Sequence, residues 1–210
     1  DEKPIIVYTL EAFQNNAQID AIAVVNLAGW DEVLRAYAKQ YRISKLKHII
    51  SGGECGQASI RNGVFELEKH YSGDDIILVH DAIRPLVSQE IISDCIVTAR
   101  RFGSAISAIP CAEAMLETDD GISSTGSYPR DGLKRAQTPQ GFPLEKLCRY
   151  HRLALEKGIT NSVASCTLAA ELGEALHFSA GSSKNIKLTT VDDFDIFKAL
   201  LTSKRETWLK

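Results

Sequence analysis

Apolar residues recur along this chain with two different periods, and the two periods alternate. In some stretches they fall every three or four residues, which is the spacing of one face of an amphipathic helix. In others they form short continuous runs, which is the pattern of a strand covered on both faces. The alternation predicts an α/β architecture with a mostly parallel sheet and disfavours an all-α or all-β fold.

The clearest helix pattern is the stripe of Ile60, Val64, Leu67 and Tyr71, spaced by four, three and four residues. The last helix is expected after residue 190, where a Thr-x-x-Asp sequence resembles a capping box. Its predicted buried face is Phe194, Phe197 and Leu201. Further helices are predicted near residues 4–13, 33–41, 88–102, 144–157 and 161–172.

Strands are predicted at residues 19–25, 48–51, 76–79, 104–109 and 175–179, and the run at 76–79 is apolar throughout. The run at 76–79 ends abruptly at His80 and Asp81, so charge begins where the strand stops. Residues 117–132 have no periodicity and are rich in Gly, Ser and Asp, which indicates an exposed arm or loop.

Composition narrows the class of protein. The 210 residues, 44% of them apolar, are enough for one sizeable core, and we expect a single domain over residues 1–210. A net charge of -3 lacks the excess of basic residues that is typical of nucleic-acid-binding proteins, so no nucleic-acid partner is expected. The five cysteines are odd in number and include no Cys-x-x-Cys pair, so neither a disulfide framework nor a zinc site is indicated.

The sequence also bears on location. No apolar run approaches the roughly 18 residues that span a bilayer, and the first residues lack the apolar core of a secretory signal. We therefore expect a cytoplasmic protein with no membrane partner.

Ligands of open α/β sheets bind beyond the carboxyl ends of the strands. That rule selects the loops at residues 51–59, 80–85 and 181–189. In the first loop, Gly52, Gly53 and Gly56 allow close approach of the backbone to a ligand, and Ser59 can donate a hydroxyl hydrogen bond. An ordinary tight turn explains the same glycines.

The second and third loops carry charge. Asp81 could hold Mg²⁺ or accept bonds from sugar hydroxyls, and Arg84 could grip a phosphate with paired hydrogen bonds. The alternative is a local ion pair that steadies the turn. Lys187 could neutralise phosphate charge, or it could be a solvated surface lysine. Arg130 and Thr138, the latter within residues 135–142, could bind the phosphate of a second substrate, although a plain turn fits residues 135–142 equally well.

Taken in order, these segments resemble the 2-C-methyl-D-erythritol 4-phosphate cytidylyltransferases and the related ribitol-5-phosphate cytidylyltransferases over nearly the whole chain. Four spaced motifs in the correct order make the resemblance specific. They are Gly52-Gly53 with Ser59-Ile60 and Asn62-Gly63, then residues 80–85 (HDAIRP), then Arg130 with Thr138-Pro139-Gln140, and finally Asn185-Ile186-Lys187 with Asp193.

The resemblance implies a Rossmann-like, three-layer nucleotidyltransferase fold with a protruding dimerisation arm, for which residues 113–132 are the candidate. It also implies that an acceptor phosphate attacks the α-phosphorus of CTP and releases pyrophosphate, with Mg²⁺ as the cofactor and a homodimer as the assembly. By the same resemblance, the cytidine is bound by Gly53, Glu54 and Ser59. The ribose, the metal ion and the polyol meet at Asp81 and Arg84. The acceptor phosphate is positioned by Arg130, Thr138 and Lys187.

The sequence departs from the family pattern at its start. Members open with a strand and a Gly-rich loop whose Arg and Lys embrace the triphosphate, and this sequence begins just after that segment. Because losing a central strand would leave a gap in the sheet, we expect roughly two dozen further residues before it. The alternative is a catalytically inactive protein.

Three internal departures also occur. Gly56 stands where an Arg is usual, and Glu113-Ala114 stands where Asp-Thr usually helps to hold the acceptor phosphate. Thr160-Asn161-Ser162 replaces a Thr-Asp-Asp run. Because of the first two changes, the motifs do not decide which polyol phosphate is the acceptor.

Our first hypothesis is the methylerythritol-phosphate enzyme of isoprenoid synthesis. The second is the ribitol-phosphate enzyme of wall or capsule polymers, with a polyol phosphate and CTP as partners in both. A catalytically inactive nucleotide-binding homologue is a third. An NAD-dependent oxidoreductase is disfavoured because no Gly-x-Gly-x-x-Gly follows a strand.

Overall fold

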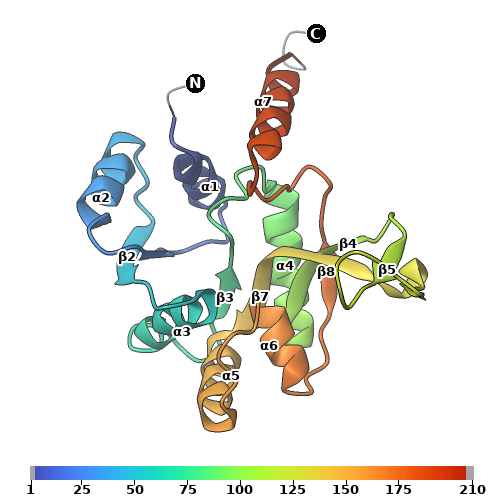
Figure 1. The fold of residues 1–210 in the computed structure, drawn as a ribbon. Helices are drawn as coiled ribbons and strands as arrows, with labels where there is room; N and C mark the ends of the chain where they lie inside the picture. Colours follow the sequence, from blue (N-terminus) through green and yellow to red (C-terminus); the bar gives the residue numbers. More distant parts are fainter. Residues whose placement is uncertain (1–2, 207–210) are drawn as a thin grey trace.

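Four strands form the central sheet of the computed structural model, which describes residues 3–206 (Figure 1). Their order is β3 (Ile76–Val79), β7 (Lys134–Pro143), β4 (Ala105–Pro110) and β8 (Phe178–Ala180). β8 runs parallel to β4, whereas β7 runs antiparallel to both of its neighbours. The predicted α/β architecture is confirmed, with a mixed sheet at its centre.

A second sheet pairs β1 (Ile22–Asn26) with β2 (Leu46–Ser51) in parallel. Asn26 pairs with Ser51 at the carboxyl ends, and the Gly52 N–H donates to the Asn26 carbonyl at 2.8 Å. The loops that follow the two strands are therefore tied together, one of them being the predicted glycine loop.

The helices lie close to their predicted positions. They are α1 (Ile5–Gln14), α2 (Asp31–Gln40), α3 (Gly56–Leu67), α4 (Gln89–Phe102), α5 (Leu144–Lys157), α6 (Ser165–Glu171) and α7 (Val191–Glu206). Local chemistry sets several ends. Ser88 caps α4 by accepting the Ile91 N–H, and Gly103 ends that helix at φ +74°, a left-handed conformation that suits glycine.

The start of α7 shows the predicted capping box. The Asp193 carboxylate accepts the backbone N–H groups of Thr189 and Thr190 at 2.7 Å, and these bonds lower the pKa of Asp193 to about 2. Only part of the predicted buried face is correct, because Phe197 is buried but Phe194 is 41% exposed.

The largest core cluster lies between the central sheet and α3, α5 and α6. Phe142 of β7 and Tyr150 of α5 meet there edge to face, with ring centroids 6.0 Å apart. A smaller cluster packs α1 against α4, and another packs Leu86 and Leu188 against Phe197 of α7. The last cluster fastens the segment before α7 to the loop that follows β3.

Strand β7 is the main element that the sequence patterns did not predict. Residues 135–142 were expected to form a turn or a phosphate-binding segment, because Gln137, Thr138 and Gln140 are polar and Pro139 lacks a backbone donor. In the structure these residues form a buried strand with a bulge. Ile106 pairs with Gln140 and Ala108 with Ala136, so residues 137–139 oppose a single residue of β4.

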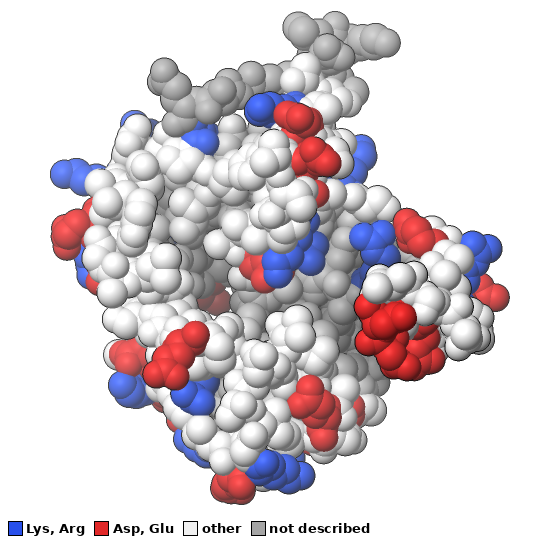
Figure 2. Space-filling model, viewed as in Figure 1, with Lys and Arg blue, Asp and Glu red and all other residues white. Residues whose placement is uncertain are grey.

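Residues 113–132 project from the body as predicted (Figure 1). They are more regular than expected. β5 (Met115–Glu117) and β6 (Gly126–Tyr128) pair as an antiparallel hairpin, followed by a 3-10 turn at Arg130–Gly132. Figure 2 shows acidic side chains gathered on this arm. The residues are Glu113, Glu117, Asp119, Asp120 and Asp131.

The prediction of a single domain over residues 1–210 remains an expectation. The predicted single domain includes residues 1–2 and 207–210, which lie outside the described residues. Within residues 3–206, no helix has the length and apolar character needed to cross a bilayer.

Candidate functional site

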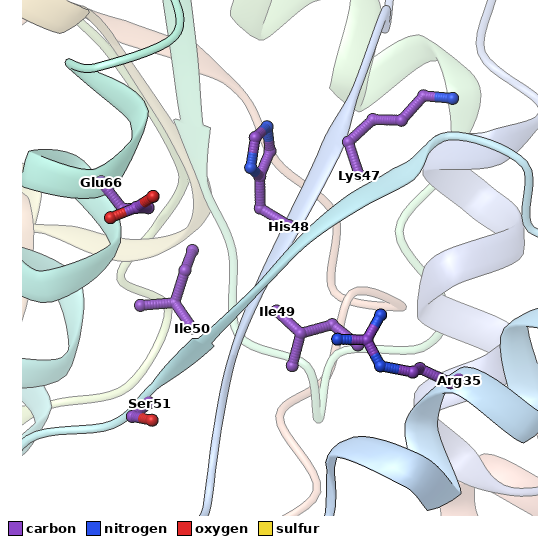
Figure 3. Close-up of a pocket in the computed structure, with 7 residues that line it drawn as sticks. All are labelled: Arg35, Lys47, His48, Ile49, Ile50, Ser51 and Glu66. Atoms are coloured by element: carbon purple, nitrogen blue, oxygen red, sulfur yellow. The ribbon is translucent and has the colours of Figure 1, made fainter.

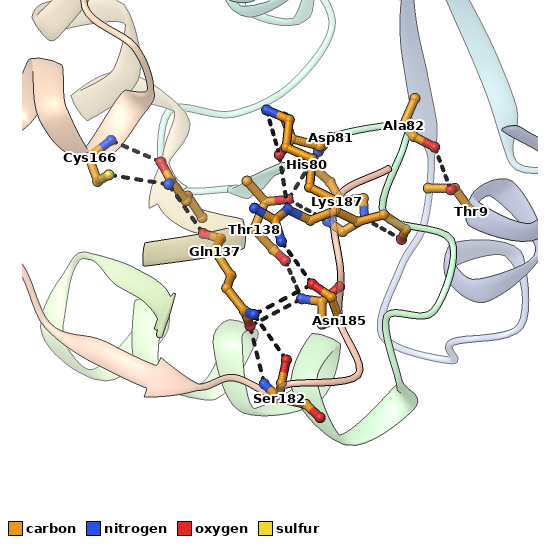
Figure 4. Close-up of polar contacts among 12 residues, drawn as sticks. Thr9, His80, Asp81, Ala82, Gln137, Thr138, Cys166, Ser182, Asn185 and Lys187 are labelled. Atoms are coloured by element: carbon orange, nitrogen blue, oxygen red, sulfur yellow. Dashed lines mark hydrogen bonds and ion pairs between the residues drawn. The ribbon is translucent and has the colours of Figure 1, made fainter. Parts of the chain in front are cut away.

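Two charged loops predicted to be functional meet beyond the carboxyl end of β3. Asp81 Oδ2 accepts a hydrogen bond from Arg84 Nε at 3.0 Å and lies 3.4 Å from Lys187 Nζ (Figure 4). The local ion pair considered as the structural alternative therefore exists. Lys187, from a segment about a hundred residues later in the chain, adds a second cation to this pair. Arg84 and Lys187 together outweigh the single carboxylate, so the cluster carries a net positive charge.

A short hydrogen-bond chain fixes the backbone beneath this cluster. The Asp81 N–H donates to Thr138 Oγ1 at 3.0 Å, and Thr138 Oγ1 lies 3.0 Å from His80 Nδ1. His80 Nε2 lies 3.2 Å from the Arg84 carbonyl oxygen, which can only accept. His80 Nε2 therefore carries the hydrogen, and the Thr138 hydroxyl donates to Nδ1.

Burial lowers the pKa of His80 to about 4, so the imidazole is neutral near pH 7. The Thr138 hydroxyl is thus committed inside the protein, and its side chain is 8% exposed. Thr138 holds the loop that carries Asp81 and has no free hydroxyl for a substrate.

Two buried amides join β7 to the segment that carries Lys187 (Figure 4). The side-chain Nδ2 of Asn185 donates to the backbone carbonyl of Thr138 at 2.8 Å. The backbone carbonyl of Asn185 accepts a hydrogen bond from Arg84 Nη1, also at 2.8 Å. Gln137 Nε2 donates to the Ser182 carbonyl at 2.9 Å, and Gln137 Oε1 accepts the Ser182 N–H at 3.1 Å. Sequence reasoning quoted both amides within motifs but assigned them no role. Their signal was a polar side chain beside apolar neighbours.

The three residues predicted to bind cytidine, Gly53, Glu54 and Ser59, lie in the glycine loop and the start of α3, directly after β2. The Gly53 N–H donates to Ser59 Oγ at 3.0 Å, and Glu54 is exposed. A Cβ on Gly53 would lie 2.5 Å from the Ala58 Cβ, so this position requires glycine. Cys55 caps α3 by accepting the Ala58 N–H at 3.5 Å.

The residues at 160–162, which depart from the family pattern, have a structural role here. Gln57 of α3 donates to the Ile159 carbonyl at 2.7 Å and accepts the Ser162 N–H at 2.6 Å. The Ser162 hydroxyl donates to Glu171 of α6 at 2.9 Å. Ser162 therefore fastens the start of α3, and with it the glycine loop, to the body of the protein.

Arg130 lies apart from the other predicted site residues in this chain. It sits in the 3-10 turn at the base of the arm, where Nη1 donates to the Ala112 carbonyl at 2.9 Å. The side chain is exposed, and among the contacts of the described residues none joins it to Asp81, Arg84 or Lys187. The structure thus brings together Asp81, Arg84, Thr138 and Lys187, but not Arg130.

A cavity of about 440 Å³ lies elsewhere, along β2 (Figure 3). It is lined by Arg35, Lys47, His48, Ile49, Ile50, Ser51 and Glu66. None of the predicted site residues lines it, although Ser51 directly precedes the glycine loop.

The donor set limits how a metal could bind. Within residues 3–206, no group of three or more His, Cys, Asp or Glu side chains is arranged to hold a metal ion. Asp81 makes both of its ion pairs through Oδ2. A single carboxylate suits Mg²⁺ only if substrate phosphates and water supply the other ligands, as is common for this ion.

The comparisons with known proteins cover nearly the whole chain. The family model for 2-C-methyl-D-erythritol 4-phosphate cytidylyltransferase matches residues 1–203. A ribitol-5-phosphate cytidylyltransferase from Lacticaseibacillus paracasei is 39% identical, over 97% of this chain and 88% of that protein. A 2-C-methyl-D-erythritol 4-phosphate cytidylyltransferase from Geobacter metallireducens is 31% identical, over 96% and 86%.

A solved structure agrees with these sequence matches. The crystal structure of a 4-diphosphocytidyl-2C-methyl-D-erythritol synthase superposes with a TM-score of 0.82 at 26% identity. The match covers 95% of this chain and 90% of that one.

Proposed function

Because this chain belongs to the 2-C-methyl-D-erythritol 4-phosphate cytidylyltransferase family, we propose that it transfers the cytidylyl group of CTP to ribitol 5-phosphate. The products would be CDP-ribitol and pyrophosphate. The observation that carries this choice of acceptor is the 39% identity to a ribitol-5-phosphate enzyme, against 31% to a methylerythritol-phosphate enzyme. It reverses the order of our two sequence-based hypotheses.

The cluster beyond β3 suits the reaction. A phosphate oxygen of the acceptor attacks the α-phosphorus of CTP, the bond to the β-phosphate bridging oxygen breaks, and pyrophosphate leaves. Arg84 and Lys187 can neutralise the phosphate charge that is crowded together in this step. Because little covalent work falls to the protein, placement of the two reactants provides most of the rate.

Asp81 is the residue that would hold Mg²⁺. Both of its ion pairs are made through Oδ2, which leaves Oδ1 as the oxygen that would ligate the ion. When bound with CTP, the ion would neutralise charge on the departing pyrophosphate.

The glycine loop would bind the cytidine through Gly53, Glu54 and Ser59. Gly53 is exposed, and its N–H donates to Ser59 Oγ, which orients that backbone. Thr138 supports the acceptor site from within the protein, as its committed hydroxyl requires.

Arg130 would act in a second copy of the chain. The arm carries exposed apolar side chains at Met115, Leu116 and Tyr128, and burying them against another subunit is favourable. A homodimer that exchanges arms would bring Arg130 of each copy to the acceptor phosphate of the other.

The test is release of pyrophosphate from CTP with ribitol 5-phosphate or with 2-C-methyl-D-erythritol 4-phosphate. We expect kcat/KM to be higher with ribitol 5-phosphate. Higher kcat/KM with the methylerythritol substrate would favour the second candidate, which the structural match supports. No turnover with either would indicate an inactive homologue.

A matched pair of variants checks that the measured activity belongs to this site. Lys187→Ala should raise the KM for the acceptor, whereas Lys184→Ala, an exposed lysine of the same segment, should not. Equal effects of the two changes would contradict the proposed site.

A further inference from the structure

The segment that carries Lys187 has little regular structure of its own. Between β8 and α7 it forms turns and extended chain, so its position depends on contacts with its neighbours. Lys187 itself is 44% exposed and pairs only with Asp81 among the contacts described. Something other than Lys187 must therefore place this segment beside Asp81.

Gln137 bonds the start of the segment, whereas the packing of Leu188 against Phe197 holds its end. Its side chain is 7% exposed and bonds both the N–H and the carbonyl of Ser182. Its Nε2 also lies 3.4 Å from the Asn185 carbonyl, the same oxygen that accepts from Arg84 Nη1. One amide thus contacts the start of the segment and the atom that orients Arg84.

The packing at Gly181 leaves no room for a side chain. A Cβ on Gly181 would lie 2.7 Å from Gln137 Oε1 and 2.7 Å from the Ala108 carbonyl oxygen. The backbone of the segment therefore rests directly on the Gln137 amide and on β4. The bulge at residues 137–139 is what turns Gln137 toward it.

We propose that Gln137 is a positioning residue for the acceptor: it holds residues 181–187 so that Lys187 and Arg84 are set for the acceptor phosphate, and it contacts no substrate itself. This inference rests on the proposed function of the site. It predicts that losing the amide affects binding of the acceptor and leaves binding of CTP at the glycine loop unchanged.

Gln140 supplies the matched control. It lies on the same strand, is 2% exposed, and is also an amide with buried bonds. Its bonds go to Cys166 of α6 and to the Gln137 carbonyl, not to residues 181–187. Replacing Gln140 disturbs the core to a similar degree without releasing the Lys187 segment.

The experiment compares Gln137→Met and Gln140→Met, since Met is unbranched and close to Gln in size. Steady-state kinetics give the KM for ribitol 5-phosphate, the KM for CTP and kcat. Because unmade buried hydrogen bonds are costly, we expect Gln137→Met to raise the KM for the acceptor about tenfold. The KM for CTP should stay near the wild-type value, and Gln140→Met should change neither KM.

Hydrogen–deuterium exchange provides a readout independent of activity. The Asn185 and Leu188 amides bond to the Ser182 and Ile83 carbonyls, both at 2.9 Å, and should exchange faster in Gln137→Met only. If that variant does not fold, Gln137→Glu, which keeps an acceptor for the Ser182 N–H, takes its place.

Unchanged exchange in residues 181–189 would overturn the proposal, as would an equal rise in both KM values. If the wild type turns over neither polyol phosphate, the proposed function fails, and exchange alone decides whether Gln137 holds the segment.

Discussion

Replacing His151 should change how the stability of this protein depends on pH. His151 lies on α5, is 2% exposed, and packs edge to face near Phe65 with ring centroids 6.4 Å apart. Neither of its ring nitrogens has a hydrogen-bond partner within the described part of the chain. Burial lowers its pKa from 6.5 to about 4, and the nearby charge of Arg61 acts in the same direction.

The sign of the effect follows from proton binding. The unfolded chain binds a proton at this histidine below pH 6.5, but the folded protein does so only near pH 4. The contribution to stability is therefore complete above pH 6.5 and is lost as the pH falls toward 4. A shift of roughly 2.5 units, at about 1.4 kcal/mol per unit, gives an upper bound of about 3 kcal/mol. About 2 kcal/mol of this is lost by pH 5.

Urea unfolding at pH 7.5 and pH 5.0 measures the effect. His151→Leu removes the titrating group and fills the same apolar site. We expect the variant to lose about 2 kcal/mol less than the wild type between the two pH values. At pH 7.5 it should be at least as stable as the wild type, because a buried ring nitrogen without a partner costs about 1–3 kcal/mol.

His70→Gln, at a histidine on the surface, serves as the control. His80, whose pKa burial also lowers to about 4, remains in all three proteins, so some loss at pH 5.0 persists in each. Parallel free-energy curves for the wild type and His151→Leu would refute the reasoning.

Three further predictions concern the site. Because Arg130→Ala and Lys187→Ala each raise the KM for the acceptor, each should have little activity alone at an acceptor concentration below the wild-type KM. Mixing them should restore about a quarter of the wild-type activity, because half of randomly formed dimers would contain one intact site; no recovery would contradict exchange of the arm. Gly56→Arg restores the residue usual at this position, where a side chain meets nothing within 4 Å. It should lower the KM for CTP by up to about tenfold through a charge-assisted hydrogen bond, and an unchanged KM would count against a nucleotide site there. Gly53→Ala should raise the KM for CTP and cost about 1–3 kcal/mol in urea unfolding, because its Cβ would press on Ala58. Wild-type values for both would show that the loop adapts.

Local signals in the sequence were enough to predict much of this structure. The stripe from Ile60 to Tyr71 and the Thr-x-x-Asp cap before α7 both describe contacts between residues near in sequence. Asp81 and Lys187 are far apart, yet one rule about the carboxyl ends of strands was enough to expect them together.

The missed features depend on contacts that no local pattern records. Strand β7 contains Pro139 beside the polar residues Gln137, Thr138 and Gln140, whose side chains bond to Ser182, to the loop after β3 and to Cys166 of α6. The roles of Gln137 and Asn185 depend on the segment that lies across them. Arg130 was predicted at the site from its place in a motif, and its place on the arm shows why sequence order alone does not locate it.

The bulge in β7 removes the side chains of residues 137–139 from the regular pairing of β7 with β4. Regular pairing between β7 and β4 resumes at Ala136 on one side and Gln140 on the other, so the ladder does not depend on the side chains at residues 137–139. The side chains at those three positions are left to bond with neighbouring loops, as Thr138 does with the loop after β3 and Gln137 does with Ser182. The scaffold can therefore hold the loops that carry Asp81 and Lys187 from the middle of a strand without interrupting that strand's pairing at either end.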